Sequence, residues 1–411
     1  NLTQHMTIAE NIFLGHLPKK GGRVDWSTVR RRSRELLDSL DVGLDVDTLT
    51  GSLTVAQQQM VEIAKALNRN TRVLIMDEPS AVLGERDIER LFDVVRRLQA
   101  SGIGIVYISH RLKEIFELAD EVTVLKDGRY VDTRKVADVT MDDLVRLMVG
   151  RDLVDVFPKR RTEPGEVVLE VSGLAQPKLA RDVSFSVRSG EIVSLAGITG
   201  SGRTEVARVI FGADKATSGQ MRLHGQPYRP RSPRDAINHG VALVNEDRKK
   251  EGLLLKLQVF FNITVSGLDR LARYRVLRLR EEKSLVAKWI ESLRIKTPGQ
   301  NFMVVNMSGG NQQKVVLARW LSLGIKVFIM DEPTRGIDVG SKSEIYQTMS
   351  DLAEQGVAII MISSELPEVL GMSDRVIVMR EGRTVKEISR AEATEELVMQ
   401  YAVGHEEAVA G

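Results

Sequence analysis

The sequence contains a long internal repeat. Residues 53–67 (LTVAQQQMVEIAKAL) resemble residues 307–321 (MSGGNQQKVVLARWL), and residues 73–83 (VLIMDEPSAVL) resemble residues 327–337 (VFIMDEPTRGI). Matching positions in the two copies are 254 residues apart (331 − 77). A constant offset over several segments indicates two homologous modules in tandem.

The repeat, together with the composition between its copies, predicts the domain boundaries. We place a first module at residues 1–149, a linker at 150–166, a second module at 167–405 and a tail at 406–411. The linker is charged and contains two prolines. In the second module a glycine loop, residues 197–204, follows a strand, and the offset puts its counterpart before Asn1. We therefore expect an N-terminally truncated first module that lacks its first strands and this loop.

Both modules alternate predicted strands with predicted helices. This alternation favours an α/β fold with a parallel sheet in each module, the first sheet being incomplete. Residues 269–293 are rich in Arg, Glu and Leu, and we expect them to form a mostly helical subdomain. Residues 25–40 are its counterpart in the first module. The alternative is that these stretches are simply solvent-exposed helices.

The composition limits the kinds of site and partner that the chain can have. The chain has 411 residues, a net charge of +2 and no cysteine. The small net charge gives no electrostatic argument for a nucleic-acid partner. The lack of cysteine excludes disulfides, thiolate metal sites and thiol catalysis. No apolar run approaches the roughly 20 residues that span a bilayer, so we expect any membrane association to depend on a partner.

The glycine loop, residues 197–204 (GITGSGRT), matches the phosphate-binding pattern except at Arg203, where that pattern has lysine. Backbone N–H groups of such a loop surround phosphates, and the Thr204 hydroxyl would bind Mg²⁺. The wider guanidinium is expected to bind phosphate but to position the terminal phosphate poorly. The loop residues predicted to bind nucleotide are Gly197, Gly200, Ser201, Gly202, Arg203 and Thr204. A glycine-rich turn without function is the alternative, and the position between a strand and a helix disfavours it.

Two acidic pairs follow apolar segments. Asp77 and Glu78 end the segment VLIMDE, and Asp331 and Glu332 end the segment VFIMDE. A single Asp-Glu pair is usually just a turn at the end of a strand. Two copies, each about 20 residues after a helix that begins with Ser or Thr, disfavour that interpretation.

The stretch 306–321 opens with Ser-Gly-Gly and continues as an amphipathic helix. Ser308 is expected to cap this helix. Gly309 and Gly310 have no Cβ, so their N–H groups can come close to a ligand. The partial positive charge of a helix N-terminus suits a phosphate. In the first module the corresponding residues 54–57 (TVAQ) contain no glycine.

This order of motifs resembles the nucleotide-binding domain of ABC transporters. The resemblance implies ATP and Mg²⁺ as ligands, with Asp77 and Asp331 at the metal and Glu78 and Glu332 polarising the attacking water. It implies that His110 contacts the γ-phosphate and orients the water. The repeat partner of His110 is Ser364, which cannot do the same. Glu246 stands where the family has a glutamine that senses Mg²⁺ and the membrane partner.

In this family the two modules meet head to tail, so each phosphate loop faces the helix N-terminus of the other module. The residues implied at these N-termini are Ser308, Gly309, Gly310 and Gln312 in the second module, and Thr54 and Gln57 in the first. Arg203, Glu246 and Ser364 would therefore share a site with Val55, whose branched side chain hinders close approach. The other site would combine Glu78 and His110 with the intact Ser308–Gly310. We expect this second site to be the competent one in the full-length protein, and to be impaired in this chain, which lacks its phosphate loop. Residues 173–178 contain no aromatic residue to stack on adenine.

Longer segments resemble one group of proteins within this family. The runs GITGSGRTE, VNEDRKKEGL, AQQQMVEIAKAL and DEPTRGIDVGSK resemble the fused double-module ATPase of bacterial monosaccharide importers. This implies ATP hydrolysis that drives sugar import, a transmembrane sugar permease dimer and, indirectly, a periplasmic sugar-binding protein. It also implies a peripheral location on the cytoplasmic face of the cell membrane and no nucleic acid. The alternatives are a soluble tandem ABC ATPase acting on ribosomes or DNA, and a nucleotide-binding fragment that does not hydrolyse ATP.

Overall fold

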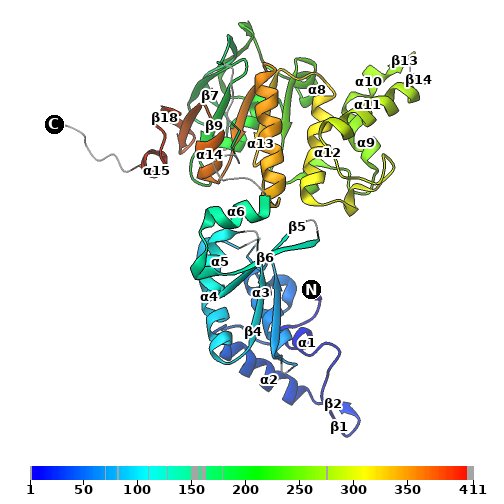
Figure 1. The fold of residues 1–411 in the computed structure, drawn as a ribbon, viewed down its shortest axis with the longest axis vertical. Helices are drawn as coiled ribbons and strands as arrows, with labels where there is room; N and C mark the ends of the chain where they lie inside the picture. The colour runs from blue at the N-terminus through cyan, green and yellow to red at the C-terminus, as the bar shows by residue number, and fades with distance from the viewer. Residues whose placement is uncertain are drawn as a thin grey trace, which may run out of the picture. The chain divides into compact units, whose positions relative to one another are not determined.

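The computed structural model describes residues 2–69, 71–80, 83–109, 111–126, 128–149, 157–158, 163–177, 179–274 and 276–404 (Figure 1). The chain divides into two compact units, Asn1–Met148 and Val149–Gly411, which are described separately. No helix in the described part of the chain is long and apolar enough to cross a membrane.

The first unit combines helices with a small parallel strand pair and two hairpins. Its helices are α1 (Ile8–Ile12), α2 (Trp26–Ser39), α3 (Val55–Leu67), α4 (Glu85–Ala100), α5 (Leu112–Leu118) and α6 (Met141–Val149). Its strands are β1 (Lys19–Lys20), β2 (Arg23–Val24), β3 (Val73–Asp77), β4 (Gly104–Ile108), β5 (Glu121–Lys126) and β6 (Arg129–Lys135). Strands β3 and β4 are parallel, whereas β1–β2 and β5–β6 are antiparallel hairpins.

The core of the first unit lies between α1, α2, α3 and one face of the β3–β4 pair. Ile8, Leu37 and Val61 are buried in it, and Leu74 and Met76 contribute the inner face of β3. Alternate residues of β3 point away from this core and are exposed. The predicted parallel pairing is confirmed, and the exposed alternate residues show that the second face of the pair is not covered.

The second unit is built on a six-stranded sheet with the order β12-β15-β16-β9-β17-β18. Its strands are β9 (Ile192–Ala196), β12 (Val241–Val244), β15 (Val327–Asp331), β16 (Ala358–Ile362), β17 (Arg375–Arg380) and β18 (Arg383–Ser389). All neighbours are parallel except β17 and β18. Every residue of β9, β12, β15 and β16 is buried, as expected for a parallel sheet covered on both faces.

A second sheet of four antiparallel strands has the order β11-β10-β7-β8. Its strands are β7 (Val167–Ala175), β8 (Val183–Arg188), β10 (Ser218–Leu223) and β11 (Gln226–Pro227). The helices of the unit are α7 (Arg203–Ile210), α8 (Pro233–Asn238), α9 (Val259–Thr264), α10 (Leu268–Leu271), α11 (Leu279–Ser292), α12 (Gly309–Leu321), α13 (Val339–Glu354), α14 (Leu366–Met372) and α15 (Glu395–Val403).

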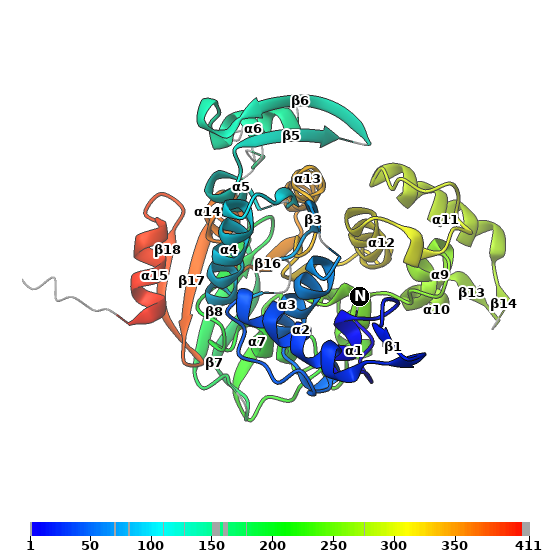
Figure 2. The same ribbon diagram turned by 90° about the horizontal axis from the view of Figure 1, so that it is seen from below.

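The stretch predicted to be a helical subdomain contains α10, α11 and a short hairpin, β13 (Ala272–Arg273) and β14 (Val276–Leu277). Figure 2 shows α9, α11 and α12 grouped together beside the large sheet. Helix α12 begins in this group, so its first residues lie between the helical part and the sheet. The carboxyl ends of the parallel strands, where ligands of open α/β sheets bind, lie at one edge of the sheet.

Candidate functional site

The glycine loop joins β9 to α7. Gly202 adopts φ 96°, and a Cβ there would lie 2.7 Å from the carbonyl oxygen of Leu179. A Cβ on Gly197 would overlap the carbonyl oxygen of Met379. The loop therefore needs glycine at both positions in order to curl before the helix. The Ser201 hydroxyl is buried and has no hydrogen-bond partner among the described residues, which fits a loop shaped to hold a polar ligand.

Arg203 and Thr204 connect this loop to two neighbouring strands. Arg203 Nη1 donates to the carbonyl oxygen of Ser363 at 3.1 Å, just after β16. Burial lowers the pKa of the Arg203 guanidinium. Thr204 Oγ1 donates to Asp331 Oδ2 at 2.7 Å, at the end of β15. The structure thus brings together three predicted site residues at the carboxyl edge of the sheet.

Asp331 and Glu332 are carboxyl groups in a partly dry environment. Burial raises the pKa of Asp331 to about 6 and that of Glu332 to about 7. Ser364 Oγ donates to Glu332 Oε2 at 3.1 Å. Glu332 has φ 49° and its counterpart Glu78 has φ 46°, a left-handed conformation that is strained for glutamate. This shared strain indicates that the turn after each strand is held in place to aim the carboxylate.

Glu246 lies beyond β12, close to the same edge. Its Oε1 is 3.8 Å from Arg335 Nη1, and both side chains are about half exposed. After burial and the bond from Thr204, the charge of Glu246 is a further influence on the pKa of Asp331, which it raises. Glu246 is therefore near enough to Asp331 for the two carboxylates to repel, a repulsion that a bound cation would screen.

The prediction that Ser308 caps α12 is wrong. Ser308 has the extended backbone of a cap residue, but its side chain makes no capping bond. Instead its Oγ accepts a hydrogen bond from Asn311 Nδ2 at 2.9 Å. In the first unit, Thr54 does cap α3: Gln57 N donates to Thr54 Oγ1 at 3.3 Å, and Thr54 N donates to Gln57 Oε1 at 2.9 Å. The Ser308 hydroxyl is thus bonded to the side chain of Asn311 and not to a helix amide.

The two glycines of α12 are packed against their own unit. A Cβ on Gly310 would overlap the side chain of Ser341, and a Cβ on Gly309 would lie 2.9 Å from the carbonyl oxygen of Gly336. Gln312 is buried, and its Nε2 donates to the carbonyl oxygen of Val304 at 3.1 Å. The glycines thus allow close packing here, and Gln312 braces the turn that precedes the helix.

In the first unit, Asp77 ends β3 and Glu78 N donates to the carbonyl oxygen of Ile108 at 2.9 Å. This bond places Glu78 at the junction of β3 and β4, as Glu332 is placed between β15 and β16. His110, the predicted water-orienting residue, lies outside the described residues.

Sequence reasoning missed a buried glutamate behind the site. Glu368 on α14 is 2% exposed and accepts hydrogen bonds from Tyr346 OH at 2.6 Å, from Ser363 Oγ at 2.8 Å and from Thr334 Oγ1. It ties the segment after Glu332 to the segment before Ser364. Its counterpart 254 residues earlier (368 − 114), Glu114, accepts from Tyr107 OH at 3.0 Å and Ser109 Oγ at 2.7 Å. The repeat carried this signal, because both copies have glutamate there.

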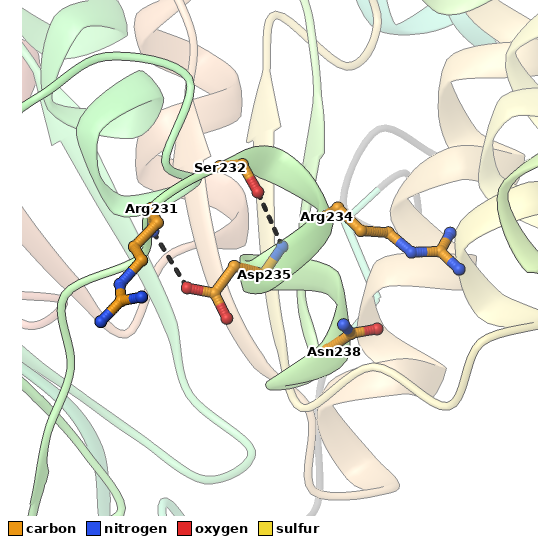
Figure 3. A pocket seen from close by; sticks show the side chains of 5 residues that line it. All are labelled: Arg231, Ser232, Arg234, Asp235 and Asn238. Carbon is orange, nitrogen blue, oxygen red and sulfur yellow. Dashed lines mark hydrogen bonds between the residues drawn. The ribbon is translucent and has the colours of Figure 1, made fainter.

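A surface pocket next to α8 contains none of the predicted site residues. Figure 3 shows its lining, Arg231, Ser232, Arg234, Asp235 and Asn238. Ser232 Oγ caps α8 by accepting from Asp235 N at 3.3 Å, and Asp235 Oδ2 accepts from Arg231 N at 3.0 Å. The polar groups of Ser232 and Asp235 are thus used to begin α8, and we assign this pocket no function.

The raised pKa values predict how pH affects the second unit. A carboxyl group whose pKa is higher in the folded than in the unfolded state stabilises the fold at low pH, and that stability is lost as pH rises through the folded pKa. For Glu332 the pKa rises from 4.5 to about 7. We therefore expect the free energy of unfolding to fall between about pH 4 and pH 7, by about 3 kcal/mol for this group.

Thermal unfolding without nucleotide or metal measures this effect. Glu332→Gln is expected to raise the Tm at pH 8, where glutamate is charged, and to leave it nearly unchanged at pH 4. Glu170→Gln, at an exposed position of β7 away from any helix end, is the control and should change the Tm little at either pH. An effect of Glu332→Gln that does not depend on pH would contradict the prediction.

Comparison with known proteins agrees with this geometry. The family model described as ABC transporter matches residues 1–81 and 180–335. "Ribose import ATP-binding protein RbsA 1" of Rubrobacter xylanophilus is 50% identical over all of this chain and 82% of the relative. "Ribose import ATP-binding protein RbsA" of Rhodococcus jostii is 50% identical over 98% of this chain and 80% of the relative. A "Putative ribose/galactose/methyl galactoside import ATP-binding protein 3" of Burkholderia cenocepacia is 46% identical over 99% of this chain and 80% of the relative.

The chain thus contains the glycine loop and the two acidic strand ends, and it matches import ATP-binding proteins over nearly its whole length. The chain belongs to the ABC transporter family, as a protein with two ATP-binding domains of that family in tandem, each an α/β fold with a parallel-sheet core.

Proposed function

We propose that this chain is the ATPase subunit of a bacterial monosaccharide importer, and that its ATP hydrolysis drives import through a membrane permease. The observation that carries the proposal is the meeting of the glycine loop with the ends of β15 and β16, through the bonds of Arg203 and Thr204. The names of relatives about half identical over the whole chain support sugar import.

The site residues divide by role in this proposal. The amides of the loop from Gly197 to Thr204 bind phosphate, with the Arg203 guanidinium beside them. Thr204 and Asp331 hold Mg²⁺ in one site, and Asp77 holds it in the other. Bound Mg²⁺ neutralises phosphate charge. Their neighbours Glu332 and Glu78 polarise water, and His110 orients it in the site of Glu78.

The remaining contacts come from the facing module. We propose that the nucleotide held by one module is also touched by the helix N-terminus of the other. These residues are Ser308, Gly309 and Gly310, supported by Gln312, and Thr54 and Gln57. We propose that the chain consists of a first ATPase domain at 1–149, a linker at 150–166, a second ATPase domain at 167–405 and a tail at 406–411.

The two alternatives are not favoured. A tandem ATPase acting on ribosomes or DNA would be expected to carry a strong basic surface, whereas the net charge here is +2. The relatives are import proteins over nearly all of this chain. A fragment that only binds nucleotide is not favoured either, because the relatives that match 98–100% of this chain are import ATP-binding proteins.

An apolar surface on the helical side of the second unit suits the permease. Leu254, Leu257, Phe261 and Val305 are exposed there, Phe261 at 47%. The two segments lie side by side, because Val304 N donates to the carbonyl oxygen of Leu257 and Val305 N to that of Leu255, both at 3.2 Å. Exposed apolar side chains gathered in one place mark interaction sites. We propose that the permease dimer binds here and holds the chain on the cytoplasmic face of the membrane. The periplasmic sugar-binding protein is then an indirect partner, through the permease, and no nucleic acid takes part.

Cell fractionation tests this proposal. The chain is expected in the membrane fraction when its permease is co-expressed and in the soluble fraction when the permease is absent. Phe261→Asp, which places a charge in the apolar surface, should lower membrane retention at least fivefold. Tyr274→Asp is the control, since Tyr274 is 87% exposed on the distant β13–β14 turn. Retention in cells that lack the permease would contradict the proposal.

A further inference from the structure

The loop after β12 has a fixed shape. Residues Arg248–Gly252 form a wide helical turn, and Asp247 Oδ1 accepts from the amide of Lys249 at 3.2 Å. Asn245 Nδ2 donates to Glu251 Oε2 at 2.6 Å across the turn. Glu246, the proposed sensor of Mg²⁺, lies between these bonded residues. Both neighbours of Glu246 are thus hydrogen-bonded within the loop.

Arg248 extends from this loop to the segment that follows Glu332. Its Nη1 donates to the carbonyl oxygen of Arg335 at 2.5 Å and its Nη2 to that of Gly336 at 2.9 Å. The two bonds use the planar fork of the guanidinium, a geometry that lysine cannot reproduce. Arg248 Nε is buried and unpaired among the described residues, so the side chain is enclosed rather than free in solvent.

The same guanidinium lies against the N-terminus of α12. A Cβ on Gly309 would be 2.6 Å from Arg248 Nη2. The missing Cβ at Gly309 thus makes room for Arg248 as well as for a nucleotide. In the first module the equivalent residue is Val55, which is 52% exposed. Arg248 is therefore in contact with three segments: the loop of Glu246, the segment after Glu332, and the first turn of α12.

We propose that Arg248 is a positioning residue that couples the loop of Glu246 to the N-terminus of α12, so that nucleotide bound at the glycine loop alters the first turn of α12 in the same unit. The inference rests on the proposed function, because it needs nucleotide at the glycine loop. Arg248 contacts no phosphate in this arrangement. It acts by holding two backbone carbonyls and the Gly309 turn in one geometry.

A fluorescent reporter measures this coupling. The chain has no cysteine, so Asn306→Cys, at an exposed position just before α12, allows a single thiol-reactive fluorophore in the full chain. Addition of Mg²⁺ and a non-hydrolysable ATP analogue is expected to change its emission. Arg248→Gln should lower that change at least fivefold while the Kd of the analogue stays within twofold. Arg248→Lys, which keeps the charge and one donor, should give an intermediate response.

Lys249→Gln is the matched control, because it removes the same charge from the next, exposed residue and should leave the response unchanged. A full response in Arg248→Gln would overturn the proposal. A Kd that rises in proportion to the lost response would also overturn it, since Arg248 would then be a nucleotide ligand. If Arg248→Gln unfolds, Arg248→Lys decides, and an undiminished response in it overturns the proposal. If the unsubstituted chain binds no analogue at all, it is the proposed function that fails.

Discussion

In the full-length protein, Glu78→Gln is expected to lower the ATPase rate, measured with the permease present, at least 100-fold. Glutamine fills the same space but cannot polarise the attacking water as a carboxylate does, and such a group contributes about 10²–10⁴-fold. Glu332→Gln is expected to lower the rate less than tenfold. The two residues are equivalent in the repeat and share the same strained backbone conformation, so the difference must come from what surrounds them.

The surroundings of Glu332 are altered in several ways at once. Arg203 replaces the usual lysine and is committed to the carbonyl oxygen of Ser363. Ser364, in place of histidine, donates to Glu332 itself. Val55 replaces a glycine at the helix that is proposed to face this site. Each altered contact is of the kind worth several kcal/mol in phosphoryl transfer. We therefore propose that this site holds nucleotide but turns over slowly.

A control separates loss of chemistry from loss of structure. Glu35→Gln, on the exposed side of α2, should leave the rate unchanged. Both Glu78→Gln and Glu332→Gln should still bind nucleotide, because neither residue is proposed to hold it. Equal losses in the two variants, or a larger loss for Glu332→Gln, would show that the two sites are assigned the wrong way round.

The parts of the fold that depend on local pattern could be predicted from the sequence. The apolar run before Asp331 is a strand buried along its whole length, and the glycine loop lies between β9 and α7 as expected. An apolar run of five residues followed by acid, in an alternating chain, leaves few arrangements other than a central parallel strand. The repeat extends the strand itself to the first module, as β3, but not its burial, because alternate residues of β3 are exposed.

The cap of α12 could not be predicted, because it depends on competition between side chains. Ser308 and Thr54 are equivalent in the repeat and both are good cap residues. Only Thr54 makes the bond, since the Ser308 hydroxyl is taken by Asn311, whose Oδ1 in turn accepts from Lys296 N at 2.8 Å. Cap preference gives the position of the helix start, which was right, but not the hydrogen-bond partner.

Arg248 and Glu368 were missed for another reason. Arg248 bonds to backbone carbonyls 87 and 88 residues further along the chain. Arg248 belongs to no short motif whose spacing reveals its role, and a charged residue in a loop is usually solvated. Glu368 lies on α14, and its match with Glu114 in the repeat was the signal for it in the sequence. Their roles depend on which distant segments the sheet brings together, and only the folded structure shows this.

We expect backbone amides of β3 and β4 to exchange hydrogen at least 100-fold faster than those of β15 and β16. Strands β3 and β4 pair only with each other among the described strands, whereas β15 and β16 lie inside a six-stranded sheet. The outward side chains differ in the same way: Val73, Ile75, Val106 and Ile108 are 59%, 66%, 48% and 46% exposed, and their counterparts Val327, Ile329, Ile360 and Ile362 are at most 1% exposed.

Burial of one such side chain stabilises a fold by about 1.5–3 kcal/mol, and a 100-fold difference in exchange needs only about 2.7 kcal/mol. The 100-fold ratio of exchange rates is therefore a lower limit. Exchange followed by mass spectrometry on the whole chain, without nucleotide, measures both strand pairs in one sample. The hairpins β5–β6 and β17–β18 give a second comparison, since β5–β6 has no further strand partner among the described strands while β17 pairs with β9. Equal protection of β3–β4 and β15–β16 would mean that the exposed face of the first unit does not weaken it, and that its helical core alone supports the two strands.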